Sequence, residues 1–332
     1  MRLGLMTGFG GDWRATLEKI RIAEDLGYEL VAVPEAWQLS AIPWLSLIAE
    51  NTSRIQIGTT IVSVYSRSPA VLAQEYASLE VISGGRMMLG IGVSSQLVGE
   101  QMHGVPFRRP LRRLREYTEI FKILIRGERL HYRGEIFTLD RGFSIRYDRP
   151  RDDVPVWIGA ITPRSLVQSG EIAEGIMPVH WPSTQMGELR DYLREGAELA
   201  GRDVSEITIA PHTPIYLLDG VNDEQTMNEA RARIENYINR MWDYYHEMMT
   251  RIGWADEVRA VQAAWAESRD REKAMAEVSD RMVRDNEVVG TMPEVRERLR
   301  ERADGGADLQ IIYMPKGSPA EAARLLEEYI SA

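Results

Sequence analysis

Strand-like segments recur at a nearly constant spacing in the first third of the chain. They begin near residues 2, 29, 55 and 86, and a segment with helical periodicity follows each of them. A separation of about 30 residues is the length of one βα unit, and successive units of this kind pair their strands in parallel through right-handed crossovers. The spacing therefore predicts an α/β fold built around a parallel sheet.

Capping signals delimit the helices between these strands. Asp12 precedes the first helix and Gly27 follows it. In the third helical segment, Ser68 stands at the N-cap position and Pro69 at the first helical position, and two glycines follow the end of the segment. These are the residue types that begin and end helices, so both boundaries are predicted from local chemistry alone.

The alternation is interrupted after the fourth strand and then resumes. The interruption contains a polar loop, an amphipathic helix over Leu111–Ile125 and a hairpin over residues 129–139. Further strands are predicted at residues 154–160, 175–179, 207–218 and 308–315, and a charged helical insertion at about residues 223–302. Eight strands with intervening helices favour a (β/α)8 TIM barrel, in a single domain over residues 1–332. A doubly wound open sheet fits less well, because no GxGxxG turn follows the first strand.

The helical insertion is rich in aromatic residues, with Trp242, Tyr244, Tyr245 and Trp254 close together. A solvated helical cover with an aromatic seam facing the core is the favoured interpretation. A lid that folds over the active face is the alternative.

Composition excludes several classes of function. The net charge of −10 argues against an electrostatic nucleic-acid partner. There is no cysteine, so neither a disulfide framework nor thiolate chemistry is available. The five histidines show no HxH or HExxH spacing, and we therefore expect no metal site. No apolar run approaches the length of a membrane span, and no signal-peptide pattern precedes the first strand, so we expect a cytoplasmic protein.

In a (β/α)8 barrel, function resides in the loops that follow the strands. Glu35 follows the second strand, beside Trp37, and is a candidate proton relay or hydrogen-bond acceptor for a cofactor. A glutamate that caps a helix fits the same position. The third strand is followed by the long polar segment from Val62 to Ser68, in which Tyr65 and Arg67 could equally be a solvated loop with an aromatic plug.

Small and polar residues follow the fourth strand. Gly92 is followed by Ser94 and Ser95, which could supply hydroxyl and amide groups to an anion, or could simply cap a helix. His103 lies further along this loop, and His180 follows the sixth strand. Both are candidate catalytic residues, although a structural histidine fits either position.

The loop after the fifth strand has the features of a phosphate site. Gly159, Ala160 and Thr162 lead into a helix, and Arg164 lies in its first turn. A helix N-terminus with a nearby arginine binds phosphate readily, and an ordinary N-cap by Thr162 is compatible with this role. Together the loops offer aromatic surface, close backbone approach and a phosphate-type pocket, which a phosphorylated planar redox cofactor requires.

The sequence resembles a known family over essentially its whole length. The run "GTTIVSVYSRSPAVLAQEYASLEVISGGRMMLGIGVSS" is similar to the signature region of the bacterial luciferase-like flavin and deazaflavin oxidoreductases, and "PVWIGAITPRSL" and "VGTMPEVRERL" continue the match. The branch it most resembles uses the deazaflavin coenzyme F420. This branch includes methylenetetrahydromethanopterin reductase, secondary alcohol dehydrogenase and glucose-6-phosphate dehydrogenase.

The resemblance implies a cofactor across the barrel mouth and a small-molecule substrate above it. In related enzymes a non-prolyl cis peptide after the third strand contacts one ring face, and the matching bond here joins Thr60 and Ile61. Thr7 and Trp37 are expected to line the same site. Glu35 stands where many relatives have an aspartate, which leaves its role open.

The other cofactor contacts are assigned by position. Ser94 and Ser95 match residues that contact the ring or its chain, whereas Gly159, Ala160 and Thr162 match the phosphate-side loop. The resemblance also implies a homodimer. Hydride transfer with F420 is the favoured activity; an FMN-dependent monooxygenase and a non-catalytic flavin-binding protein are the alternatives.

Overall fold

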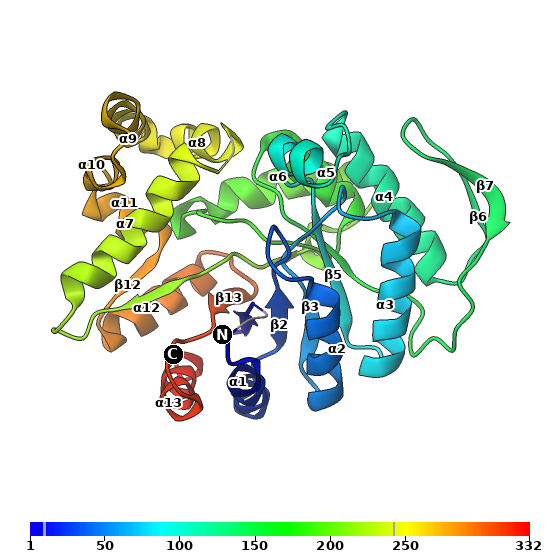
Figure 1. The fold of residues 1–332 in the computed structure, drawn as a ribbon, viewed down its shortest axis with the longest axis horizontal. Helices are drawn as coiled ribbons and strands as arrows, with labels where there is room; N and C mark the ends of the chain where they lie inside the picture. The colour runs from blue at the N-terminus through cyan, green and yellow to red at the C-terminus, as the bar shows by residue number, and fades with distance from the viewer. Residues whose placement is uncertain (9–10, 242) are drawn as a thin grey trace.

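The computed structural model describes residues 1–8, 11–241 and 243–332. Trp242 of the predicted aromatic seam lies outside the described residues, as does part of the loop after the first strand. Parallel strands in the order of the chain form the central sheet (Figure 1). Within the described ranges, its eight barrel strands are β1 (Leu3–Met6), β2 (Leu30–Val33), β3 (Gln56–Thr59), β5 (Met87–Gly92), β8 (Val156–Ile158), β9 (Gly175–Ile176), β10 (Thr208–Ile209) and β13 (Gln310–Tyr313).

Backbone hydrogen bonds between the last two strands close this sheet into a barrel. Ile311 N–H donates to the Pro211 carbonyl at 3.0 Å, and Thr213 N–H donates to the Ile311 carbonyl at 2.8 Å. β13 also pairs in parallel with β1. The predicted (β/α)8 barrel is therefore confirmed. A short extension of the third strand, β4 (Val62–Ser63), continues beside β5.

Helices surround the barrel, and their ends follow the predicted capping chemistry. They are α1 (Trp13–Leu26), α2 (Ala41–Asn51), α3 (Pro69–Ser83), α4 (Pro110–Ile125), α5 (Pro163–Ile172), α6 (Met186–Leu199), α12 (Met292–Asp304) and α13 (Pro319–Ile330). The Asp12 carboxylate accepts from the Ala15 N–H, and Gly27 ends α1 with a positive φ of 92°. The Ser68 hydroxyl accepts from the Val71 N–H at the start of α3. No described helix is both long and apolar enough to cross a membrane.

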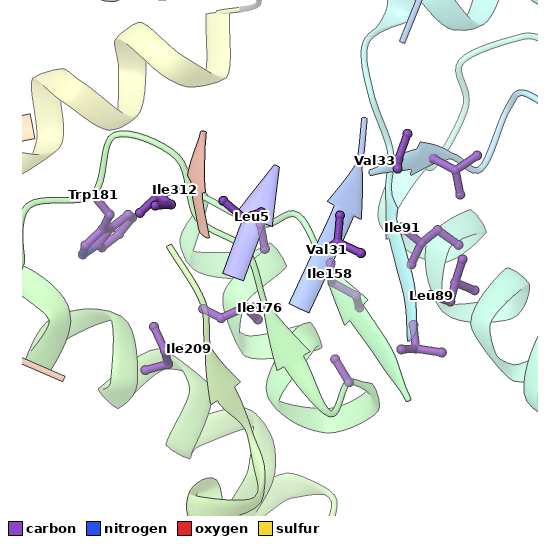
Figure 2. Packing of buried hydrophobic residues seen from close by; sticks show 14 of the residues in the cluster. Leu5, Val31, Val33, Leu89, Ile91, Ile158, Ile176, Trp181, Ile209 and Ile312 are labelled. Carbon is purple, nitrogen blue, oxygen red and sulfur yellow. The ribbon is translucent and has the colours of Figure 1, made fainter. Parts of the chain in front are cut away.

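The interior of the barrel is packed with side chains. Alternate residues of each strand point inward, and the inner cluster consists of Leu30, Ala32, Met88, Trp157, Met177, Ala210, Leu309 and Ile311. Met6 and Ile61 pack against this cluster while remaining partly exposed. The other face of the strands forms a larger apolar cluster with residues of the helices, and Figure 2 shows Leu5, Val31 and Leu89 of this cluster on their strands. The barrel is therefore a solid core.

The strand predicted over residues 207–218 is two separate strands in the structure. β10 belongs to the barrel, whereas β11 (Ile215–Leu217) pairs in parallel with β12 (Val288–Gly290) in a sheet of its own. Pro211 and Pro214 lie between them and have no N–H to donate, so a continuous ladder cannot pass through this segment.

The predicted hairpin is present and is held by a buried carboxylate. β6 (Leu130–Arg133) pairs antiparallel with β7 (Thr138–Phe143). The Glu116 carboxylate of α4 accepts three backbone N–H groups from the turn, at 2.8 to 3.0 Å. Charge-assisted hydrogen bonds of this kind offset the cost of burying the carboxylate.

The region predicted as a helical insertion contains several short helices. They are α7 (Asp223–Asn239), α8 (Asp243–Met249), the π-helical turn η4 (Thr250–Trp254), α9 (Ala255–Ser268), α10 (Arg271–Ala276) and α11 (Asp280–Asn286). Strand β12 then separates these from α12, which packs beside α13 as a barrel helix. Helices α7 to α10 gather at one end of the molecule and the β6–β7 hairpin lies at the opposite end (Figure 1).

Candidate active site

An isoleucine side chain lies on glycine backbone at the mouth of the barrel. Ile61 follows β3 through a cis peptide bond with Thr60, as the resemblance implies. A Cβ atom at Gly92 would lie 3.1 Å from Ile61 Cδ1, and one at Gly159 would lie 3.3 Å from Ile61 Cγ2. The two glycines therefore allow the side chain to rest against the ends of β5 and β8. The half-buried isoleucine and bare backbone form an apolar surface that suits one face of a planar ring.

A buried hydrogen bond joins opposite sides of this mouth. Thr60 Oγ1 lies 2.7 Å from His212 Nε2, and both residues are buried. Burial lowers the pKa of His212 to about 3, and the nearby Arg233 guanidinium acts in the same direction. His212 is therefore a neutral imidazole. It was noted in the sequence only as one of five histidines, and its position directly after β10 was the available signal.

This burial predicts a pH dependence of stability. Because the folded-state pKa of His212 lies below the unfolded value of about 6.5, the unfolded chain binds the additional proton and stability falls as the pH drops below that value. The change between pH 6.5 and 5.5 is about 1 kcal/mol for one such histidine. Between pH 6.5 and 5.5, the free energy of unfolding measured in urea should therefore fall by about 1 kcal/mol more in the wild type than in His212→Gln.

The control for this prediction is the range from pH 8.5 to 7.5, where the wild type and His212→Gln should change equally, because His212 is neutral there in both the folded and the unfolded chain. An unchanged pH dependence in His212→Gln would contradict the assignment of His212 as a buried neutral base.

The Glu35 carboxylate is fully engaged with its neighbours. It forms a two-pronged ion pair with Arg67, at 2.6 Å for Nη1–Oε1 and 3.1 Å for Nη2–Oε2. It also accepts the Ala41 N–H at 2.8 Å and the Ser40 hydroxyl at 3.2 Å. Burial raises the pKa of Glu35, but the hydrogen bonds from Arg67 and Ala41 outweigh it, and the net shift of this pKa is downward. The carboxylate is thus a fixed anion.

This ion pair connects two loops of the mouth. The Glu35 N–H donates to the Ile61 carbonyl at 3.2 Å, and the Arg67 Nε atom contacts Glu75 of α3 at 3.1 Å. A solvated loop residue was one sequence interpretation of Arg67, but the structure holds its side chain, which is 15% exposed, between two carboxylates. No local pattern could identify these partners, since Glu35 and Arg67 lie on different loops. A catalytic role of Glu35 stays a prediction.

The two serines after β5 differ in their surroundings. Ser94 is half-buried and has a positive φ of 54°, whereas Ser95 is fully buried. The Ser95 hydroxyl accepts the Val98 N–H at 3.1 Å, so it caps the short helical segment that begins at Gln96 and continues as the π-helical turn η1 (Val98–Met102). His103 ends this turn, and no hydrogen bond among the described residues joins it to Glu35 or His180. Ser94 is therefore the freer of the two for a cofactor contact.

Among the described residues, the loop after β8 has one cation without a described partner, Arg164, and leads into a capped helix. Thr162 and Ser165 form a reciprocal capping box at the start of α5, and Ala160 is buried. The capping box uses the amide that a phosphate would otherwise bind, so Thr162 acts as an N-cap here. Arg164 is exposed in the first turn. Arg251 of η4 donates to the Ile161 carbonyl at 3.1 Å, which places a second guanidinium beside this loop.

Two further predicted cofactor residues lie at the same end of the barrel. The Thr7 N–H donates to the Ala32 carbonyl at 3.0 Å, directly after β1, and the Thr7 side chain is buried. Trp37 follows β2 and exposes 56% of its surface. An exposed indole at a barrel mouth is a surface on which a planar group can stack. Both placements are consistent with a cofactor site, and their roles stay predictions.

His180 is covered rather than open to a substrate. Its side chain is fully buried, its ring meets the Tyr237 ring edge-on at 4.3 Å, and its Nδ1 atom lies 3.0 Å from Glu287 Oε1. Burial lowers the pKa of His180, although Glu287 acts in the opposite direction. The three predicted catalytic residues therefore do not form one cluster. Glu35 pairs with Arg67, His180 contacts Glu287, and His103 ends η1. Within the described ranges, no three acids or histidines are grouped to hold a metal ion.

A comparison with known protein families shows to which family the chain belongs. A family model described as luciferase-like monooxygenase matches residues 1–309. The chain belongs to the luciferase-like monooxygenase family. The resemblance in the signature region is thereby confirmed.

Two relatives cover nearly the full length of this luciferase-like protein. A Mycobacterium tuberculosis protein, provisionally named a coenzyme F420-dependent oxidoreductase, is 26% identical over 331 residues, or 94% of each chain. The 5,10-methylenetetrahydromethanopterin reductase of Methanopyrus kandleri is 27% identical over 320 residues, covering 92% of this chain and 90% of the relative.

A solved structure confirms the fold. The coenzyme F420-dependent tetrahydromethanopterin reductase from Methanopyrus kandleri superimposes with a TM-score of 0.82, at 22% identity over 98% of this chain and 97% of that chain. At this identity the comparison supports the luciferase-like barrel and its insertions, and not a shared substrate.

Proposed function

We propose that this luciferase-like protein is an oxidoreductase that transfers a hydride between coenzyme F420 and a small organic substrate. The observation that carries the proposal is the apolar surface formed by Ile61 on Gly92 and Gly159. It lies at the barrel mouth of a chain that has a full-length relative named as an F420-dependent oxidoreductase. When bound, F420 would supply the hydride-carrying carbon.

The residues of the chain would position this cofactor rather than perform covalent chemistry. Ile61 would support one ring face, and the Glu35–Arg67 ion pair would hold the loop that carries it. Arg164 and Arg251 lie on the side of the mouth where an anionic cofactor chain would extend. Holding the two reactants in a fixed geometry provides much of the catalysis in such a reaction.

Cofactor titration of the full-length protein tests the proposal. Binding should quench F420 fluorescence with a lower Kd than the binding of FMN. Gly159→Val should weaken F420 binding at least tenfold, because the added side chain meets Ile61 at the mouth. Gly187→Ala in α6 is the control, since a Cβ atom there has open space.

Two outcomes would replace the proposal. Preference for reduced FMN with oxygen uptake would identify a monooxygenase, which the family description favours as the second candidate. Binding of a cofactor without turnover of any donor or acceptor would instead support a flavin-binding protein that has no catalytic role.

The proposal includes a homodimer formed through α3. Val71, Val81 and Ile82 of this helix expose 43%, 52% and 46% of their surfaces, although its inner face is buried. An exposed aliphatic stripe on a barrel helix suits a self-complementary contact. Light scattering should give the dimer mass for the wild type and the monomer mass for Val81→Glu. A wild-type monomer would contradict this part of the proposal.

A cytoplasmic location is the last part of the proposal. It is supported by the sequence pattern alone, and fractionation of the native cells with an antibody against the protein tests it.

A further inference from the structure

A group of buried and half-buried polar side chains lies where α7 meets the ends of β9, β10 and β13. Its members are His180, His212, Arg233, Glu287, Arg302, Tyr237 and Tyr313. The cation–carboxylate contact at its centre joins Arg233 Nε to Glu287 Oε1 at 3.2 Å. The Arg233 side chain is 15% exposed and that of Glu287 is 1% exposed.

The charges in this buried group do not balance. Arg302 is also buried, and its Nη2 donates to the Trp181 carbonyl at 3.3 Å rather than to a carboxylate. Two guanidinium groups therefore share one carboxylate, that of Glu287. The two histidines are neutral, because burial lowers the pKa of each. Among the described residues of the group, one positive charge has no partner, which is costly in a buried site.

Several polar atoms of the same group lack hydrogen-bond partners within the described part of the chain. They are Arg233 Nη2, Arg302 Nε, His180 Nε2 and Glu287 Oε2, whereas His180 Nδ1 lies 3.0 Å from Glu287 Oε1. A buried donor without a partner costs about 1–3 kcal/mol, and native proteins rarely leave several of them together. The arrangement is that of a binding site whose ligand completes the contacts.

The position of Arg233 connects this group to the barrel mouth. Its guanidinium carbon lies 4.9 Å from the centre of the Tyr313 ring and 5.0 Å from that of Tyr237. The Tyr313 ring meets the His212 ring edge-on at 6.2 Å, and His212 contacts Thr60, the residue before Ile61. A ligand group on Arg233 is therefore two rings away from the apolar surface assigned to the cofactor.

We propose that Arg233 binds a carboxylate group of the substrate through its unpartnered Nη2 atom. One unpartnered positive charge matches a single negative charge, whereas a phosphate dianion would leave an excess. The planar guanidinium also matches the geometry of a carboxylate. The inference rests on the proposed function, because it places the substrate beside the cofactor surface. Tyr245 of α8 packs edge-on against Tyr237, with the ring centres 4.7 Å apart, and covers this side of the group.

Thermal unfolding of the full-length protein with small probes tests this inference. Propionate should raise the Tm at matched ionic strength, whereas its neutral isostere propionamide should not, and inorganic phosphate should have less effect than propionate. Arg233→Met should weaken the response to propionate at least tenfold, and Arg233→Lys should retain part of it. The matched control is Arg231→Met on the same helix, since Arg231 pairs with Glu224 and Asp280 instead.

The comparison of propionate with propionamide needs no variant, so it tests the presence of a carboxylate site even if Arg233→Met does not fold. An equal response to both probes, a stronger response to phosphate, or a loss of response in Arg231→Met would each refute the carboxylate site. F420 titration of the same preparation separates the two proposals. A propionate response without F420 binding would refute only the proposed function, and F420-dependent turnover without a propionate response would refute only this inference.

Discussion

Replacing Arg67 by methionine is expected to lower the free energy of unfolding by about 3–5 kcal/mol. The substitution leaves the Glu35 carboxylate, only 9% exposed, without its ion-pair partner, and Glu75 loses the same cation. A buried charge without a partner is costly because its lost hydration is not replaced. Chemical denaturation monitored by far-UV circular dichroism measures the change.

The matched control is the same type of ion pair on the surface. Arg2 contacts both carboxylate oxygens of Glu29, but these side chains are 52% and 43% exposed. Arg2→Met should therefore cost only about 0–1 kcal/mol. The double variant Arg67→Met/Glu35→Gln should recover part of the loss, because the unpaired charge is removed. An equal cost at Arg67 and Arg2 would show that the Glu35–Arg67 pair is not buried as described.

Gly196→Ala is expected to destabilise the protein by about 3 kcal/mol or more. A Cβ atom on Gly196 of α6 would lie 1.8 Å from the Val167 carbonyl oxygen of α5, and one on Gly170 of α5 would lie 2.2 Å from the Leu193 carbonyl oxygen. Both neighbours are backbone atoms, so neither helix can yield by a side-chain rotation. The two helices must therefore move apart. Because α5 carries Arg164, this movement would also displace a residue of the proposed cofactor site.

Gly187→Ala on the same helix provides the comparison for this prediction. No atom lies within 4 Å of its added Cβ, and alanine loses less backbone entropy on folding than glycine. We therefore expect no loss of stability, or a gain of up to about 1 kcal/mol. Urea unfolding curves of both variants decide the matter. If Gly196→Ala were as stable as Gly187→Ala, α5 and α6 would not pack backbone to backbone.

The strongest sequence predictions concerned features that neighbouring residues determine. The spacing of strand-like segments predicted the parallel barrel, and Asp12, Gly27 and Ser68 predicted helix ends that the structure contains. These features depend on backbone chemistry within a few residues, so they can be read along the chain. The break between β10 and β11 was missed because a run of apolar residues concealed the effect of Pro211 and Pro214.

The candidate site was only partly predictable for a different reason. Barrel topology identified the loops after the strands, and the structure places Thr60, Ile61 and Gly159 together at the mouth. The hydrogen-bond and ion-pair partners of the side chains around them could not be deduced from the sequence. Glu35 proved to be paired with Arg67, and the ring of His212 meets Thr60 across 152 positions of sequence.

The sequence by itself therefore determined the type of fold, the ends of many helices and the loops in which a site would form. Only the tertiary structure decided which side chains in those loops are charged, neutral or paired. Arg233 shows why: it lies on an unremarkable charged helix, yet the fold places it beside Glu287, Tyr237 and Tyr313 in a buried environment. Burial and long-range contacts set the state of such a group, and neither is encoded in its immediate sequence neighbours.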